Sequence, residues 1–297
     1  MQRKEFLRQS GMAAIAVGVF GNIQWNENHF IGDTPTTTDI LGPFYRPGAP
    51  FRTNLNPPGF NGEILHFSGT IFREDGKTPA NNCLVEIWQC QADGLYDNVS
   101  DYFLYRASQQ VNKDGKYHFI TTIPIPYPSE ENSPVFRPAH IHMRISVKGQ
   151  QDLITQVYLK GDPHLDTDPS TKSSLSVNRV LTLKKRKEKE SELNFDIVLK
   201  KEYVPADNVF HQVSGTYKMS DKSIMEFYRD RDFLLWKWNG EVRGGLFYQG
   251  NNTFVGGVND TQAKFELQPQ GNAKLVFRFE RRRSINLTGI KLINYKR

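Results

Sequence analysis

The chain has 297 residues, a net charge of +6 and a mean hydropathy of −0.56, with 38% hydrophobic and 24% charged residues. This composition is typical of a globular protein with its own core, and it excludes a disordered or collagen-like chain. At about 150 residues per domain, the length favours two domains. The basic residues are dispersed and no 18-residue apolar run follows the N-terminal segment, so we expect neither nucleic-acid binding nor an integral membrane span.

The first 30 residues have the pattern of an export signal. Arg3, Lys4 and Arg8 form a positive segment, and Met12–Phe20 is a short apolar stretch that resembles the hydrophobic part of a signal. The order Arg-Lys-x-Phe-Leu-Arg is similar to a twin-arginine signal, with Lys4 in place of the second arginine. We therefore expect an exported protein, periplasmic or extracellular, and assign residues 1–30 to the leader.

Residues 31–203 show the pattern of an all-β unit. Short alternating runs are separated by turns, several of them with Asp-Gly, and this spacing predicts an antiparallel β-sandwich. The predicted strands are His66–Phe72, Leu84–Gln89, Tyr117–Ile123, Ile141–Val147, Leu153–Leu159 and Leu193–Leu199. Because a sandwich leaves exposed strand edges, we also expect a homodimer.

Residues 209–297 predict a second all-β unit, a small up-and-down barrel of about eight strands. Turn residues such as Asn239-Gly240 and Asn251-Asn252 separate its strands. The stretches Val213–Tyr217 and Asn252–Phe254 resemble the small lipocalin-like domain at the C-terminus of some bacterial secreted hydrolases. Five aromatic residues favour core packing over a ligand pocket: Trp236, Trp238, Phe247, Tyr248 and Phe254.

A pair of histidines is the first chemical signal. His140 and His142 lie two apart in a strand pattern, so alternation places both imidazoles on one face. Two such imidazoles form half of a metal site. The alternative is a pair of ordinary core or surface histidines.

Other side chains near this pair are candidates to complete a metal site. Cys90, the two histidines and a water would suit zinc. Tyr96 follows a turn, and prolines on both sides hold Tyr127 in an extended conformation. Phenolate oxygens suit a high-charge metal such as ferric iron, and two phenolates with one hydroxide give a neutral site that tolerates a dry pocket. Simple packing is the alternative for both tyrosines.

Five stretches, occurring in order, carry a resemblance to a known family. They are Leu41–Pro50, Leu84–Tyr96, Pro124–Pro128, Arg137–His142 and Leu153–Asp162. Together they resemble the intradiol ring-cleavage dioxygenases, near the protocatechuate 3,4-dioxygenase branch. The resemblance implies a β-sandwich with one non-haem Fe(III), whose ligands would be Tyr96, Tyr127, His140 and His142.

The resemblance also implies an activity and further site residues. A small aromatic diol would be cleaved by O2 between its two hydroxylated carbons, giving a muconic acid. Tyr127 would leave the metal and help to take up a proton, and Arg137 would stabilise the developing anion. Gln156 would orient Arg137 or the substrate, and Tyr45 would line the mouth of the site. The alternative is a salt bridge within the sheet for Arg137, strand solvation for Gln156 and packing for Tyr45.

Two functions from other classes remain as alternatives. The chain would be a non-catalytic binding module if the barrel captured an aromatic or lipid ligand. It would be a zinc hydrolase if His140 and His142 held zinc instead of iron. The intact set of Tyr96, Tyr127, His140, His142 and Arg137 favours the dioxygenase.

Overall fold

The computed structural model describes residues 24–26, 29–31, 36–129, 133–148, 150, 152–172, 174–199, 207–231, 233–256, 260–269, 272–280 and 284–292. Strands make up 49% and helices 5%, so the predicted all-β class is confirmed. Two short antiparallel strands, β1 (Gln24–Asn26) and β2 (His29–Ile31), come from the predicted leader region. The rest of the predicted signal lies outside the described residues, and export stays a prediction. Within the described residues, no helix is long and apolar enough to cross a membrane.

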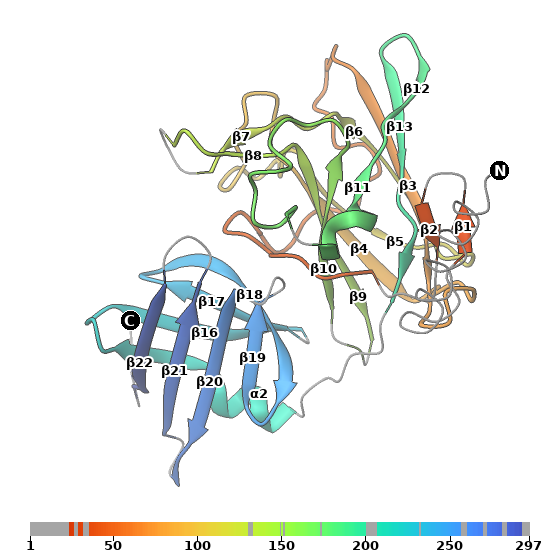
Figure 1. Cartoon of the computed structure of the whole chain (residues 1–297). Helices are drawn as coiled ribbons and strands as arrows, with labels where there is room; N and C mark the ends of the chain where they lie inside the picture. The colour runs from red at the N-terminus through yellow and green to blue at the C-terminus, as the bar shows by residue number, and fades with distance from the viewer. Residues whose placement is uncertain are drawn as a thin grey trace, which may run out of the picture.

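Two sheets form the predicted sandwich (Figure 1). The first, here called the histidine sheet, has the order β11-β10-β9-β4-β5; the second has the order β12-β13-β3-β14, with β6 also paired to β3. The strands of the histidine sheet are β4 (Cys83–Trp88), β5 (Arg106–Gln110), β9 (His140–Val147), β10 (Leu153–Leu159) and β11 (Val180–Leu181). Those of the second sheet are β3 (Ile64–Phe72), β6 (Lys116–Thr122), β12 (Lys184–Lys187), β13 (Glu190–Asn194) and β14 (Ile197–Val198). A separate short pair joins β7 (Tyr127–Pro128) to β8 (Phe136–Arg137).

One apolar core holds the two sheets together. Phe67 of β3 and Phe119 of β6 face Val85, Ile141 and other alternate residues of the histidine sheet, and all are fully buried. The inward residues follow the period of two that the sequence predicts for strands. Burial of this apolar surface therefore fixes which residues of β9 face inward and which face outward.

The sandwich differs from the prediction in two ways. It is mixed rather than purely antiparallel, because β10–β11, β13–β3 and β14–β3 are parallel pairs. The predicted strand Leu193–Leu199 is also broken into β13 and β14. The Asp196 carboxylate accepts a hydrogen bond from the Thr70 backbone N–H at 2.8 Å, in the gap between the two pairings with β3. The Asp196 side chain thus accepts the hydrogen bond that a backbone carbonyl would accept in a continuous strand pair.

The C-terminal strands close into an eight-stranded barrel, as predicted. They are β15 (Gly215–Met219), β16 (Ile224–Asp230), β17 (Phe233–Trp238), β18 (Glu241–Gly250), β19 (Thr253–Gly256), β20 (Thr261–Leu267), β21 (Ala273–Phe279) and β22 (Ile285–Lys291). The helix before the barrel was not predicted: α2 (Asp207–Val213) packs Phe210 and Val213 against the barrel core. The lipocalin-like resemblance of this region stays a prediction.

The five barrel aromatics divide between two clusters. Trp236 and Phe254 are buried in the barrel core, and Trp238 and Tyr248 pack against it. Phe247 belongs instead to a cluster outside the barrel, because its neighbour Leu246 points inward. The sequence could not distinguish these two directions, since both bury an aromatic ring.

The barrel docks on the outer face of the histidine sheet through an apolar patch. Tyr228, Leu235 and Phe247 of the barrel join one cluster with residues that include Tyr45 and Trp88. Figure 1 shows the barrel below the sandwich, with β17 and β18 on the side toward it. The barrel is therefore in contact with the same sheet face that carries the paired histidines.

Candidate metal centre and anion site

Four polar side-chain atoms converge at one end of the histidine sheet. The Oη atoms of Tyr96 and Tyr127 are 3.3 Å apart, and Tyr127 Oη lies 3.2 Å from His140 Nε2. The Nε2 atoms of His140 and His142 are 3.1 Å apart. All four residues are at least 91% buried. The four predicted ligands are thus adjacent in space, although 46 positions separate Tyr96 from His142 in the sequence.

The strand pattern places the two histidines. On β9 the inward residues Ile141 and Met143 belong to the sandwich core, so His140 and His142 project from the opposite face. There His142 stacks on Trp88 of β4, its cross-strand partner, with ring centroids 4.8 Å apart and planes within 9°. Gly42 contacts the other side of this histidine: with φ +76°, it leaves the His142 Cε1 atom 3.2 Å from where a Cβ would be.

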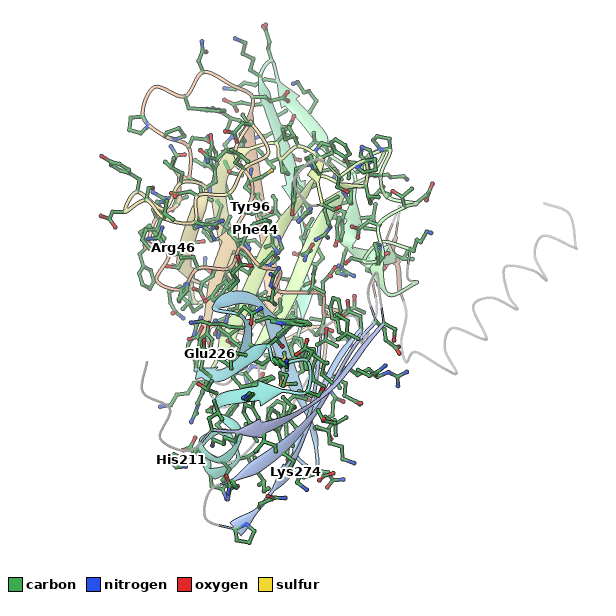
Figure 2. All side chains as sticks on the ribbon, turned by 90° about the vertical axis from the view of Figure 1, so that its left-hand side faces the viewer. Phe44, Arg46, Tyr96, His211, Glu226 and Lys274 are labelled. Carbon is green, nitrogen blue, oxygen red and sulfur yellow. The ribbon has the colours of Figure 1, made fainter. Side chains whose placement is uncertain are left out.

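The two tyrosines come from loops that are held by local structure. Tyr96 follows a tight turn closed by the Gln91 N–H, which donates to the Leu95 carbonyl at 2.8 Å. Phe44 stacks on the Tyr96 ring at 4.4 Å, and Figure 2 shows the two side by side on the sandwich. Tyr127 lies on β7, directly opposite Arg137 on β8.

The donor set fits a high-charge metal ion. His140 Nδ1 lies 2.6 Å from the Pro138 carbonyl, an acceptor only, so Nδ1 carries the proton and Nε2 presents its lone pair to the centre. Among the described residues no three His, Cys, Asp or Glu side chains gather to hold a metal. Burial raises the pKa values of Tyr96 and Tyr127, so a strongly charged cation is needed to ionise both phenols at neutral pH.

Cys90 is not part of this set. Its thiol is buried and donates to the Ile125 carbonyl at 3.5 Å, and burial raises its pKa. Both Cys83 and Cys90 are free thiols. The alternative zinc site that uses Cys90 therefore has less support from the structure than the tyrosine pair.

Arg137 lies beside the four converging atoms as a buried cation. Its Nε donates to the Asp168 carboxylate at 2.7 Å, and Nη2 donates to Gln156 Oε1 at 2.9 Å and Tyr158 Oη at 3.2 Å. Burial lowers its pKa, but Tyr158, Tyr127 and Asp168 outweigh this effect and raise it. The guanidinium is therefore a fixed, oriented positive charge.

Gln156 is oriented on both ends of its amide. Its Nε2 donates to the Ile40 carbonyl at 2.7 Å while Oε1 accepts from Arg137, which fixes the amide orientation. It is fully buried opposite His142 on β10, so the alternative of a solvated strand residue is wrong. Gln156 contacts Arg137, and its orienting role stays a prediction.

The structure adds polar residues that sequence reasoning missed. Tyr158 donates to Asp39 at 2.8 Å, and Asp39 pairs with buried Arg179. Asp168 and Asp39 thus supply carboxylates to two buried arginines. No local pattern marks these residues, because their partners lie up to 140 positions away.

Tyr45 lies behind Trp88 rather than beside the four atoms. Its ring meets Trp88 edge-on at 5.0 Å, and its hydroxyl accepts from Arg144 at 2.7 Å and donates to Glu86 at 3.3 Å. It is buried, which agrees with the packing alternative. Its predicted substrate contact stays a prediction.

Sequence comparison places residues 40–201 in a family. They match the family model described as Dioxygenase. A chlorocatechol 1,2-dioxygenase of Rhodococcus opacus is 32% identical over 45% of this chain and 60% of its own length. An intradiol ring-cleavage dioxygenase of Aspergillus niger is 31% identical over 65% and 67%, respectively. A catechol 1,2-dioxygenase of Acinetobacter lwoffii is 36% identical over 46% and 55%. The chain thus spans about 55–67% of the length of these relatives.

Solved structures agree on the fold. Catechol 1,2-dioxygenase from Pseudomonas arvilla C-1 aligns with a TM-score of 0.51 and 24% identity, covering 68% of this chain and 70% of that one. 3-Chlorocatechol 1,2-dioxygenase from Rhodococcus opacus 1CP aligns with a TM-score of 0.50 and 20% identity, covering 68% and 90%. The barrel strands, from Gly215 onward, lie beyond the matched family region. The family match over more than half of the chain, together with the shared sandwich, shows that this protein belongs to the intradiol dioxygenase family.

Proposed function

We propose that this chain binds one ferric ion through Tyr96, Tyr127, His140 and His142 and cleaves a catechol-type aromatic diol with O2. One observation carries the proposal: two phenol oxygens and two imidazole nitrogens converge within 3.3 Å of their neighbours. Hydrogen bonds alone do not match this arrangement, because the single lone pair of His140 Nε2 faces both Tyr127 Oη and His142 Nε2. A single cation resolves it.

Bound ferric iron would supply the Lewis acidity that ionises a chelated diol and makes its ring reactive toward O2. The protein ligands would offset part of the charge of the ferric ion. Two tyrosinates and neutral imidazoles leave a site of low net charge, which suits its burial. The proton on His140 Nδ1, held by the Pro138 carbonyl, keeps Nε2 available as a ligand throughout.

Arg137 stabilises negative charge that develops on the substrate. Its guanidinium is buried, permanently charged and held at Nε by Asp168 and at Nη2 by Gln156. Such a preorganised cation needs no reorientation during the reaction. Tyr127 lies directly opposite Arg137. Burial raises the pKa of Tyr127, and the nearby Arg137 cation partly offsets this rise and favours the phenolate form. When Tyr127 is not a metal ligand, its Oη would take up a proton.

The substrate class follows from the donor set and the relatives. Two adjacent hydroxyl oxygens on an aromatic ring can chelate one metal ion. The matched relatives are named for chlorocatechol and catechol and for hydroxyquinol. We therefore propose an aromatic 1,2-diol, cleaved to a muconic acid derivative.

Visible absorption of the iron-loaded protein tests this function. We expect a broad tyrosinate-to-iron band that moves to longer wavelength when catechol is added without oxygen. Admitting air should then consume O2 and form a ring-opened diacid. A protein that stays colourless after incubation with ferric iron would contradict the proposal, and a zinc ion bound in its place would identify the hydrolase alternative.

A further inference from the structure

The barrel contacts the histidine sheet at a polar cluster two residues along β9 from His142. Arg144 projects from the same outer face as His142 and is fully buried. Its guanidinium contacts the Asp152 carboxylate at 2.6 Å and the Asp230 carboxylate of the barrel at 2.6 Å. Asp230 is the last residue of β16, so the barrel supplies part of the charge balance of this sheet.

A second ion pair joins the barrel to the sheet, and in this pair the barrel supplies the positive charge. Arg231 pairs with Glu86, which lies opposite Arg144 on the neighbouring strand β4. Arg231 has φ +57°, a conformation that is unfavourable for a residue with a Cβ. Such backbone persists where the surroundings hold it in place. Two consecutive barrel residues, Asp230 and Arg231, thus form ion pairs with Arg144 and Glu86 of the sheet.

Both of these sheet residues hold the Tyr45 hydroxyl. Arg144 Nη1 donates to Tyr45 Oη at 2.7 Å, and Tyr45 Oη donates to Glu86 Oε1 at 3.3 Å. Burial raises the Tyr45 pKa, so the hydroxyl keeps the proton that it donates. The barrel turn therefore supports this hydroxyl on its acceptor side through Asp230 and on its donor side through Arg231.

Tyr45 in turn supports the ring that stacks on His142. Its edge contacts Trp88 at 5.0 Å, and Trp88 stacks on the His142 ring at 4.8 Å. No acceptor among the described residues reaches the indole Nε1 of Trp88. The orientation of Trp88 consequently depends on its ring contacts, and Tyr45 is one of them.

From these contacts we infer that the barrel is a built-in support for the metal centre, with Asp230, Arg231, Arg144, Glu86 and Tyr45 as positioning residues for His142. The sequence of contacts runs from the barrel turn to the charged pair, then to Tyr45, Trp88 and His142. The inference assigns the barrel, which lies outside the matched family region, the role of holding His142 in position. The inference rests on the proposed function only in treating His142 as a ligand.

Imidazole NMR of the metal-free protein tests the support without any need for iron. The chain has seven histidines, so the spectrum of a histidine-labelled sample contains the signals of seven rings, and H142Q identifies those of the ring to follow. The test variant is D230N/R231N. Asparagine tolerates the positive φ at position 231, so this variant removes both charges with little added backbone strain. We expect the His142 signal to move, because its ring shift depends on the stacked Trp88.

A matched control breaks an ion pair elsewhere on the barrel. Arg278 Nε donates to Glu280 at 2.6 Å, and both side chains are about half exposed, at 56% and 44%. Arg278 lies on β21, whose two neighbours in the barrel are β20 and β22. R278Q/E280Q should leave the His142 signal in its wild-type position.

Metal affinity provides the second readout. Loss of an outer support of a histidine ligand typically weakens metal binding by about tenfold or more, so D230N/R231N should release ferric iron to a chelator at least that much more readily. An unmoved His142 signal in the folded variant would overturn the inference. If D230N/R231N does not fold, Y45F replaces it, and an unmoved signal there has the same meaning. A wild-type protein that takes up no iron would contradict the proposed function. The NMR comparison would still test whether the barrel positions His142.

Discussion

The histidine sheet and the barrel use strand alternation in different ways. In β20 and β21 of the barrel, buried and exposed residues alternate regularly, so only one face of each strand is covered. In β9 and β10 of the histidine sheet, the first six residues of each strand are all buried. The inner face of this sheet is apolar, while the outer face carries His140, His142, Arg144 and Gln156. A second buried face allows a sheet to hold polar groups in fixed positions, provided that they satisfy one another.

Substitution of a histidine should show the largest difference in activity between the histidine sheet and the barrel region. H142Q removes one of the four proposed metal ligands, so we expect ring cleavage to fall to background and the iron content to drop. H211Q changes an exposed histidine on α2 of the barrel, visible in Figure 2, and should leave both unchanged. Oxygen uptake and metal analysis of the two purified variants provide the comparison. Full activity in H142Q would remove His142 from the site.

Removal of the buried cation should affect both stability and chemistry. R137M leaves Asp168, whose side chain is only 2% exposed, without its partner, and breaking such a pair costs about 3–5 kcal/mol. In the barrel, F277A should cost a similar 3–5 kcal/mol by cavity formation, yet the folded variant should still cleave its substrate. Urea unfolding and turnover per folded molecule distinguish the two. If R137M retains turnover, Arg137 has only a structural role.

Two glycines with similar backbones should differ in their effect on activity. G42A and G250A both place a Cβ at a positive φ, +76° and +92°, and each should cost about 1–2 kcal/mol. Only at position 42 does the new methyl group meet His142, 3.2 Å away; at position 250 nothing lies within 4 Å. We therefore expect similar losses of melting temperature but reduced turnover in G42A alone. Equal turnover would show that the His142 ring moves aside without consequence.

Substitution of an aspartate in a turn should have the smallest effect on stability. The effect should be similar in the sandwich and in the barrel. Hydrogen bonds from the Thr78 hydroxyl and N–H lower the pKa of Asp75 from 3.8 to about 2, and the Ser223 hydroxyl lowers that of Asp221. A lowered folded-state pKa stabilises the fold above the unfolded value and loses this stabilisation as pH falls through about 2. D75N should thus melt slightly below wild type at neutral pH. The difference should shrink between pH 4 and pH 2, and a constant difference would exclude this linkage.

Much of the fold was predictable because alternation and turn residues are local signals. The barrel has the predicted number of strands, and most strands of the sandwich lie within a few residues of their predicted positions. Parallel pairing of β13 with β3 was not predictable, since these strands are more than 100 residues apart and share no local pattern.

The convergence of the four proposed ligands was predictable to a lesser degree, through spacing and resemblance. His140 and His142 are marked by their spacing, and the two tyrosines by family motifs. Asp168, Asp39 and Arg179 carry no such mark, because a buried ion pair is defined by the partner and not by the sequence around it. The same holds for the outward direction of Phe247, which only the closed barrel and its docking reveal.

The contacts between barrel and sheet also impose an order on biosynthesis. Asp230 follows its partner Arg144 by 86 residues, and Arg231 follows Glu86 by 145. At about 5–20 residues per second, the ribosome needs about 4–17 s to add those 86 residues. During that time the nascent sandwich presents Tyr45 and its neighbours without their cover. Contacts so distant in sequence also slow folding, so the newly made chain is most exposed to aggregation and to chaperones before its last third has emerged.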